Sequence, residues 1–568
     1  MTLQTDAKDL RNGGQILVQQ LKIHGTKRVF MVAGESYLPC IDAFYDHQGV
    51  IDPIVCRQES GAVYMAEAYG KLTGEPGVCF VTRGPGATNA SVGVHTAFQD
   101  STPLILFVGQ VGNDHIEREA FQEIDYRKMF GSLCKWVAQI DRTERIPEFV
   151  ARAFAVATSG RPGPVVLALP EDTLWGRSNV PDLPRYVRTQ ISPSSQDISA
   201  LVSLITQAKR PMMVLGGSGW TQESREQIGL FALAFEIPVG VSWRRLECMD
   251  WDHPNFVGHI GWGMTHELRE QLTQADLIIS VCAHLNEPTS EGYSWIESPM
   301  PRQRLIHIYP DPSELGRLYH PSLAITATPV GFAQALQGLS PSYAPGRGEW
   351  VKSCHQDYLN SLVPLDAPGT LNLNAVSAQV DALLPRDACV TVGAGNYALF
   401  PHRYRRFSGI GTSLAPVVGT MGYGLPAAIS AKLESPERTV VCFAGDGCFQ
   451  MTCQELGVAM QYRLGIVVLV FNNSMWGTIR AHQEREFPGR TIALGFDNPN
   501  FSQLIQAYKG FGQTVTRTED FAAAFKTALE FAHTQRLPAL IELQYDADGI
   551  APGDTLTQIR ARALAKVS

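Results

Sequence analysis

Two polar stretches in the last third of the chain carry residue types suited to a metal and phosphate site. Asp446 lies between Gly445 and Gly447 directly after an apolar run, and Asn473 closes the next apolar run. If both runs are strands of a parallel β-α-β unit, with a helix predicted over 450–462 between them, their ends lie on the same edge of the sheet. A carboxylate, an amide oxygen and turn carbonyls are hard oxygen donors that suit Mg²⁺. The flanking glycines let backbone N–H groups approach a phosphate.

Each of these stretches also has a purely structural interpretation. Asp-Gly is a common turn pair, and Asn-Asn commonly ends a strand. The co-occurrence of the two at successive strand ends favours a site. Two competing phosphate motifs do not fit, because the chain has no GxxxxGK and "GGSGWTQ" (216–222) lacks the third glycine of a dinucleotide fingerprint.

The segment "GDGCFQMTCQELGVAMQYRLGIVVLVFNN" (445–473) resembles the thiamine-diphosphate signature of the acetolactate synthase-like enzymes. The resemblance extends through most of the chain and implies thiamine diphosphate and Mg²⁺ as cofactors. It implies that Asp446, Asn473 and the main-chain oxygen of Met475 bind the Mg²⁺. Gly445, Gly447 and Cys448 would contact the cofactor.

A second segment, "CRQESGAVYMAEAYGKLTG" (56–74), resembles the part of this family that carries the catalytic carboxylate. Thiamine chemistry requires a carboxylate at N1′ of the aminopyrimidine, so that the ring can remove the proton at C2. The resemblance gives this role to Glu59. Gln58 stands where the family often has His. By residue type alone, Glu59 would be an acid in the first turn of a helix.

Further cofactor contacts are implied by three shorter resemblances. In "VVGTMGYGLPAAISA" (417–431), Met421 would be the apolar wedge beneath the cofactor, although a methionine alone is more often core filler. The stretches "GAGNYALF" (393–400) and "TRGPGATNA" (82–90) resemble segments near the diphosphate and the pyrimidine. The remaining implied contacts are Gly84, Asn396, Tyr397 and the carbonyl of Gly419.

The substrate region departs from the synthases at Glu35, in "VAGESYLP", where they carry a small residue. Related decarboxylases carry an Asp there, so Glu35 is a candidate proton donor or acceptor. The alternative is a helix cap or first-turn acid. Gln122, with Phe121 and Gln110, matches the synthases and is expected near the substrate.

Two more departures concern the second substrate. His482 stands where the synthases have a tryptophan that selects the acceptor, and Glu171 replaces a lysine. His482 is a candidate acid or base, or a surface histidine. The synthases also keep an Arg-Phe-Asp-Asp-Arg segment that holds FAD, whereas this chain reads "CAHLNEPTSEG" (282–292). We therefore expect FAD to be absent, with a bound FAD or another nucleotide as the alternative.

The elements that must position these residues follow an α/β pattern. Short β-branched runs alternate with helix-length segments throughout, which is typical of parallel sheets. Two linker-like stretches, 188–197 and 340–349, divide the chain. We predict three parallel-sheet α/β domains. They are a pyrimidine-binding domain at 1–187, a central Rossmann-like domain at 192–340, and a diphosphate- and Mg-binding domain at 365–568.

Composition limits the partners. The chain has 568 residues and a formal net charge of −8, without a basic footprint for nucleic acid. No apolar run is long enough to span a membrane, and the polar N-terminal stretch does not resemble a secretory signal. Eleven cysteines without a CxxC pair suit a reducing compartment. We expect a cytoplasmic protein that binds neither nucleic acid nor membrane.

The resemblance implies decarboxylation of a 2-oxoacid with carboligation, at active sites shared between subunits of a homodimer or homotetramer. Three alternatives stay open. These are a decarboxylase that does not ligate, a lyase of the 2-hydroxyacyl-CoA type, and a non-catalytic regulatory paralogue.

Overall fold

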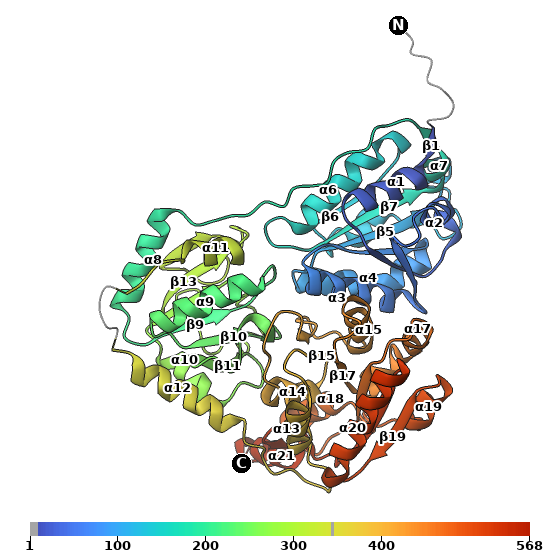
Figure 1. The fold of residues 1–568 in the computed structure, drawn as a ribbon. Helices are drawn as coiled ribbons and strands as arrows, with labels where there is room; N and C mark the ends of the chain where they lie inside the picture. The colour runs from blue at the N-terminus through green and yellow to red at the C-terminus, as the bar shows by residue number, and fades with distance from the viewer. Residues whose placement is uncertain (1–9, 342–345, 568) are drawn as a thin grey trace. The chain divides into compact units, whose positions relative to one another are not determined.

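A computed structural model describes residues 10–341 and 346–567. The chain divides into two compact units, Met1–Thr189 and Gln190–Ser568, which are described separately below. Together they contain three six-stranded parallel sheets with flanking helices (Figure 1), which confirms the predicted fold class. Among the described residues, no helix combines the length and apolarity needed to cross a bilayer.

The first unit is built on one six-stranded sheet. Helices cover both faces of this sheet, so its strands are buried on both sides and consist of continuous apolar runs. The central strands β4, β5 and β7 are buried along their whole length. The strand order is β3 (Asp52–Val55), β2 (Arg28–Met31), β4 (Gly77–Val81), β5 (Leu104–Gln110), β7 (Pro164–Pro170), β6 (Trp136–Gln139). Helices α1 (Gly13–Ile23), α2 (Leu38–Tyr45) and α6 (Ile146–Thr158) lie on one face, and α3 (Glu59–Thr73) and α4 (Gly84–Gln99) on the other (Figure 1).

The second unit begins with a sheet of Rossmann type. Its strand order is β11 (Phe256–Ile260), β10 (Val239–Ser242), β9 (Pro211–Leu215), β12 (Leu277–Val281), β13 (Arg304–Tyr309), β14 (Leu323–Thr326). In chain order this is 3-2-1-4-5-6, the order of dinucleotide-binding domains. Its helices are α8 (Ser195–Gln207), α9 (Gln222–Ala234), α10 (His266–Gln274) and α11 (Pro329–Ala335), followed by α12 (Gly348–Ser361).

The C-terminal sheet repeats the topology of the first unit. Its order is β16 (Ser413–Leu414), β15 (Cys389–Val392), β17 (Val440–Gly445), β18 (Val467–Asn472), β20 (Ala539–Gln544), β19 (Phe511–Val515). Both sheets therefore read 2-1-3-4-6-5 in chain order. The main helices are α13 (Leu373–Leu383), α14 (Leu399–Tyr404), α15 (Gly424–Glu434), α17 (Leu456–Gln461), α18 (Gly477–Glu486), α19 (Phe501–Ala507), α20 (Thr518–Gln535) and α21 (Leu556–Val567).

Two local expectations need correction. The predicted helix over 450–462 is split into α16 (Asp446–Gln450), a short 3-10 turn and α17. The break lies at Thr452, which leaves the helical region (φ −139°) while its hydroxyl donates to the carbonyl of Gly422 at 2.7 Å. The predicted linker 188–197 ends early, because Ser194 caps α8 through a capping box. Part of the second predicted linker, 342–345, lies outside the described residues.

Candidate functional site

Asp446 directly follows strand β17 of the C-terminal sheet and begins helix α16. Gly445 is the last residue of β17 and, in an extended conformation, the N-cap of α16. The strand thus passes directly into the helix, without the separate turn that the Gly-Asp-Gly sequence suggested. The Asp446 side chain is 4% exposed. Its Oδ1 accepts from the Gly447 N–H at 2.8 Å, and its Oδ2 accepts from the Ser474 N–H at 2.8 Å.

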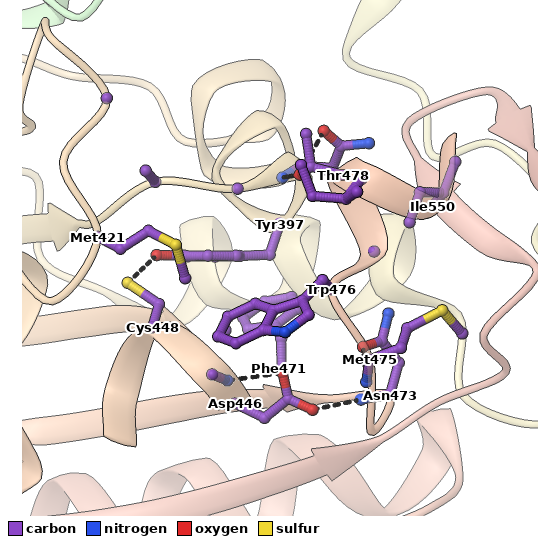
Figure 2. Close-up of a pocket in the computed structure, with 18 of the residues that line it drawn as sticks. Tyr397, Met421, Asp446, Cys448, Phe471, Asn473, Met475, Trp476, Thr478 and Ile550 are labelled. Atoms are coloured by element: carbon purple, nitrogen blue, oxygen red, sulfur yellow. Dashed lines mark hydrogen bonds between the residues drawn. The ribbon is translucent and has the colours of Figure 1, made fainter. Parts of the chain in front are cut away.

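Asn473 reaches Asp446 from the neighbouring strand. β17 and β18 pair in parallel, with Gly445 opposite Phe471. The Asn473 N–H donates to Asp446 Oδ2 at 3.3 Å, and Asn473 Oδ1 accepts from the Met475 N–H at 3.3 Å. Figure 2 shows the Asp446 carboxylate pointing toward Asn473. The topology therefore brings together the three residues that the sequence proposed as metal ligands.

The Asp446 carboxyl group is held by hydrogen bonds, without an ion pair in the part of the chain that the structure describes. Burial raises the pKa of this carboxyl group, while hydrogen bonds from Asn498 and three backbone N–H groups lower it. Among the described residues no lysine, arginine or histidine forms an ion pair with it. The same residues contain no cluster of three His, Cys, Asp or Glu side chains that could hold a metal ion. A buried carboxylate beside amide and carbonyl oxygens therefore fits a hard cation that takes its other ligands from water or phosphate.

A cavity of about 250 Å³ opens beside Asp446. Most of its lining residues follow β15, β17 and β18 or lie at the start of α18. Figure 2 shows that Met421, from the loop before α15, and Ile550 also line it. Every cofactor contact proposed for this half of the chain lines it, namely Asn396, Tyr397, Gly419, Met421, Gly445, Asp446, Gly447, Cys448, Asn473 and Met475.

A buried hydrogen-bond chain fixes one wall of the cavity. The Tyr397 hydroxyl donates to Cys448 Sγ at 3.2 Å and accepts from the Gly393 N–H at 3.1 Å. Cys448 Sγ also accepts from the Gly422 N–H at 3.1 Å. Burial raises the pKa of Tyr397 well above its usual value, so this hydroxyl stays protonated. The bonds link the turn after Met421 to the start of α16.

Two residues beside Asp446 were not predicted from the sequence. Trp476 lies so close to Gly447 that a Cβ at that position would meet the indole at 2.3 Å. This packing explains the second glycine of Gly-Asp-Gly. Asn498 Nδ2 donates to Asp446 Oδ2 at 2.9 Å and to Asn472 Oδ1 at 2.8 Å. Asn498 lies in a polar loop, "FDNPN" (496–500), so its type and spacing gave no signal that it reaches β17 and β18.

The Rossmann-type sheet supports the loop that carries Met421. Trp243 and Arg244 follow β10, at the carboxyl edge where such sheets bind dinucleotides. Arg244 Nη1 donates to the carbonyl of Pro416 at 2.6 Å, and Trp243 Nε1 donates to the carbonyl of Val417 at 3.2 Å. Beside them, a Cβ on Gly216 would meet Ser242 Oγ at 2.2 Å. This part of the edge is packed against protein.

In the first unit, Glu59 begins α3. The Gln58 side chain caps this helix by accepting from the Ser60 N–H at 2.6 Å. Glu59 Oε2 accepts from Asn89 Nδ2 at 2.9 Å, and a Cβ on Gly86 would lie 3.6 Å from Glu59 Oε1. The glycines expected in a GPG loop instead begin helix α4, where a Cβ on Gly86 would be in ordinary van der Waals contact with Glu59 and in tighter contact, 3.0 Å, with Thr82 Cγ2. Asn89 belongs to the quoted loop segment, but its contact with Glu59 was not predicted.

The other candidates of this unit surround Arg83, which sequence analysis did not single out. Arg83 Nη2 donates to Glu35 Oε1 at 3.4 Å and, more closely, to Glu171 Oε1. The Gly84 N–H donates to the carbonyl of Gln122 at 3.0 Å. Gln122 has a φ of +65°. Glu35, Gly84 and Gln122 therefore gather at one edge of the sheet, as expected for residues that follow β2, β4 and β5.

His482 is the candidate of the second unit that lies away from the cavity beside Asp446. It lies on the exposed side of α18, with its Nδ1 3.0 Å from Arg485 Nη1, and it does not line the cavity. The buried Glu484 on the same helix accepts from Arg560 Nε of α21 at 2.7 Å and from Arg480 Nε at 2.8 Å. Pairing with Arg560 lowers the pKa of Glu484 to about 2. This clamp holds the helix that also supplies Thr478 to the cavity.

Comparison with known proteins gives three matches to family models. Residues 11–129 match the N-terminal TPP binding domain of the thiamine pyrophosphate enzymes, residues 198–336 their central domain, and residues 393–543 their C-terminal TPP binding domain.

Whole-length relatives are similar to the chain over almost all of its length. The acetolactate synthase isozyme 3 large subunit of Escherichia coli is 32% identical over 93% of this chain and 94% of its own. The isozyme 2 large subunit of the same organism is 30% identical over 91% of this chain and 93% of its own length. A probable acetolactate synthase large subunit of Methanocaldococcus jannaschii is 28% identical over 96% of this chain and 95% of its own length.

Proposed function

The chain belongs to the thiamine-pyrophosphate-dependent enzymes of the acetolactate synthase large-subunit family, and on that premise we propose that it decarboxylates a 2-oxoacid and joins the remaining acyl group to a second carbonyl compound. Membership gives thiamine-dependent chemistry on C–C bonds. The choice of decarboxylation with carboligation, and the Mg²⁺ requirement, are the proposed parts.

The observation that carries the proposal is the unneutralised Asp446 carboxylate beside the 250 Å³ cavity. Asp446, Asn473 Oδ1 and the carbonyl of Met475 would hold Mg²⁺, and the glycine backbone at 445 and 447 would face the diphosphate. When bound, thiamine diphosphate supplies an electron sink for the electron pair left as CO₂ departs. Met421 and Tyr397 would shape the wall against which the cofactor rests.

Glu59 would hold the proton on which the activation of the cofactor depends. Its Oε2 is engaged by Asn89, so its Oε1 is the atom that would pair with a protonated ring nitrogen. Gly86, which places no side chain beside Oε1, would leave room for a flat ring there. Glu35 and Gln122 would control protons at the substrate. For His482, whose side chain faces solvent, we propose a secondary role in binding a polar acceptor.

We propose a homo-oligomer in which Glu59 of one chain serves the cofactor held by Asp446 of another. The cavity beside Asp446 is slightly smaller than the roughly 300–1,000 Å³ usual for ligand pockets. A second protein surface would then complete the enclosure. We keep 1–187, 192–340 and 365–568 as the proposed domain bounds.

We further propose that the central domain works without FAD. Trp243 and Arg244 use part of its ligand-binding edge to hold the carbonyls of Pro416 and Val417. Its role would then be to fix the loop before Met421. The absorbance spectrum of the purified protein tests this, since a bound flavin would colour the protein yellow and no flavin band is expected.

A product screen tests the main proposal. The purified protein, with thiamine diphosphate and Mg²⁺, is incubated with a panel of 2-oxoacids, and CO₂ and carbonyl products are followed by NMR. We expect donor loss that depends on both cofactors and yields a 2-hydroxyketone. Free aldehyde as the sole product would favour the non-ligating decarboxylase, and no loss of any 2-oxoacid would reject the proposal.

A further inference from the structure

Three charged side chains meet at the carboxyl edge of the first unit's sheet. Glu35 follows β2, Arg83 follows β4 and Glu171 follows β7. A single nitrogen of Arg83, Nη2, contacts a carboxylate oxygen of each acid, at 3.4 Å for Glu35 and more closely for Glu171. The Arg83 side chain is 9% exposed, while those of Glu35 and Glu171 are 65% and 38% exposed. The acids therefore face outward and the cation lies beneath them.

The cation in this trio is already committed. One guanidinium is shared by two carboxylates, which leaves a net charge of about −1. Arg83 Nη1 donates to the carbonyl of Phe121 at 3.4 Å. The Nε–H of Arg83 is buried without an acceptor among the described residues. The two carboxylates already neutralise the positive charge of the Arg83 guanidinium. This charge is therefore not available to bind the carboxylate of a substrate.

The loop beside the trio adds to the negative charge. Gln110 Nε2 holds it by donating to the carbonyl of Ile124 at 2.9 Å, and the Gly84 N–H holds the carbonyl of Gln122. Phe121, at the tip, is 70% exposed. The charged residues of segment 113–128 are Asp114, Glu117, Glu119, Glu123 and Asp125 against Arg118, Arg127 and Lys128, and Lys128 Nζ pairs with Asp125 Oδ2 at 3.1 Å.

The trio adjoins Glu59 through one short segment. Arg83 precedes Gly84, Pro85 and Gly86. Asn89 Nδ2 donates to Glu59 Oε2, and a Cβ added on Gly86 would lie 3.6 Å from Glu59 Oε1. The end of β2 is tied to the same segment by the hydrogen bond between Ser36 Oγ and Thr82 Oγ1, at 3.0 Å. Segment 82–89 therefore links the trio to Glu59, and under the proposed function the substrate would react beside this segment.

We propose that the second substrate is an uncharged carbonyl compound of the aldehyde class, and that Glu35, Arg83 and Glu171 select against a second 2-oxoacid. This inference rests on the proposed function. The donor 2-oxoacid loses its negative charge as CO₂ leaves, so nearby acids also favour its reaction. A 2-oxoacid acceptor would keep its carboxylate beside the acids throughout.

The reaction balances without an oxidant. The donor's bond between the carbonyl carbon and the carboxylate breaks to release CO₂. A new C–C bond joins that carbonyl carbon to the aldehyde carbon, and the aldehyde oxygen takes up one proton from solvent. One 2-oxoacid anion, one aldehyde and one proton thus give one 2-hydroxyketone and one CO₂.

A competition experiment tests this inference. The holoenzyme receives the 2-oxoacid that the screen identifies as donor, labelled with ¹³C, together with an equal concentration of acetaldehyde, and NMR measures both products. We expect the product from acetaldehyde to exceed the product of two 2-oxoacids by at least about tenfold. In Glu35→Gln and Glu171→Gln this ratio should fall severalfold, since each removes a negative charge.

The matched control is Asp52→Asn, an exposed acid at the amino end of β3 on the opposite edge of the sheet, which should leave the ratio unchanged. A wild-type excess of the product from two 2-oxoacids, or equal ratios in Glu35→Gln and Asp52→Asn, would overturn the inference alone. No donor loss with any 2-oxoacid would overturn the proposed function and this inference with it.

Discussion

The first and last sheets share the strand order 2-1-3-4-6-5 but carry different chemistry at their carboxyl edges. After β17, the C-terminal sheet places a lone buried carboxylate, Asp446, among amide donors. After β4, the N-terminal sheet places a buried cation, Arg83, beneath two acids. Under the proposed function, the first edge would hold a cation and a phosphate, and the second would discriminate between charged and uncharged substrates.

The difference shows that topology fixes where chemistry can occur and side chains fix which chemistry it is. In both sheets a buried strand, β17 or β4, leads into a helix whose first turn contains glycine. In the C-terminal sheet Gly447 makes room for Trp476, and in the N-terminal sheet Gly86 lies near Glu59. The same strand order therefore carries two unlike arrangements of side chains.

The largest effect is expected at the N-terminal edge, from Glu59→Gln. If this edge supplies proton control and the other supplies cofactor binding, kcat should fall by about 10²–10⁴-fold, while affinity for thiamine diphosphate stays near that of the wild type. Steady-state kinetics and a cofactor titration by tryptophan fluorescence measure the two quantities. Loss of cofactor affinity in step with kcat would contradict the assigned division of roles.

At the C-terminal edge, Asn498→Ala should weaken metal and cofactor binding while leaving kcat near that of the wild type once the site is filled. Asn498 orients the Asp446 carboxylate through a 2.9 Å hydrogen bond, so its removal should weaken Mg²⁺ binding by about 10–100-fold. At saturating Mg²⁺, kcat should recover. Isothermal titration of the cofactor at several Mg²⁺ concentrations measures this. A kcat defect that excess Mg²⁺ does not rescue would show that Asn498 does more than position Asp446.

A smaller effect is expected from Gly447→Ala. Its Cβ would meet Trp476 at 2.3 Å, and overpacking of this kind costs about 1–3 kcal/mol. Gly348→Ala is the control, because that glycine also begins a helix and its Cβ would have its nearest neighbour at 3.8 Å. Urea unfolding should place the control within about 0.5 kcal/mol of the wild type. Equal stabilities of the two variants would refute the close packing.

The smallest effect concerns the clamp between α18 and α21. The pKa of Glu484 is lowered to about 2 in the folded protein, so the clamp stabilises fully above the unfolded value of about 4.5 and is lost as pH falls toward 2. As the pH is lowered from about 4.5 to about 2, the Tm of the wild type should fall further than the Tm of Glu484→Gln. Parallel melting curves across that range would indicate that the Glu484 charge contributes nothing to stability.

Much of this architecture was predictable because apolar runs and strand ends are local features of the sequence. The pairing of Asp446 with Asn473 followed from the β-α-β pattern alone, and the structure brings them together. Asn498 and Trp476 could not be found in this way, since they reach Asp446 and Gly447 through loop conformation. The helix over 450–462 failed because Thr452 bonds to Gly422, a tertiary contact without a local signal. The position of Arg83 between Glu35 and Glu171 was not predicted either, because these three residues follow three separate strands, β4, β2 and β7.

The central claim is that the two unlike edges are halves of one catalytic centre contributed by different chains. Co-expression of Glu59→Gln and Asp446→Asn chains tests it most directly, through the specific 2-oxoacid turnover of the purified mixture. Each variant alone should be inactive. Random pairing should return about a quarter of wild-type activity, because half of the dimers are mixed and each mixed dimer has one intact centre. A mixture no more active than either variant alone would contradict the account.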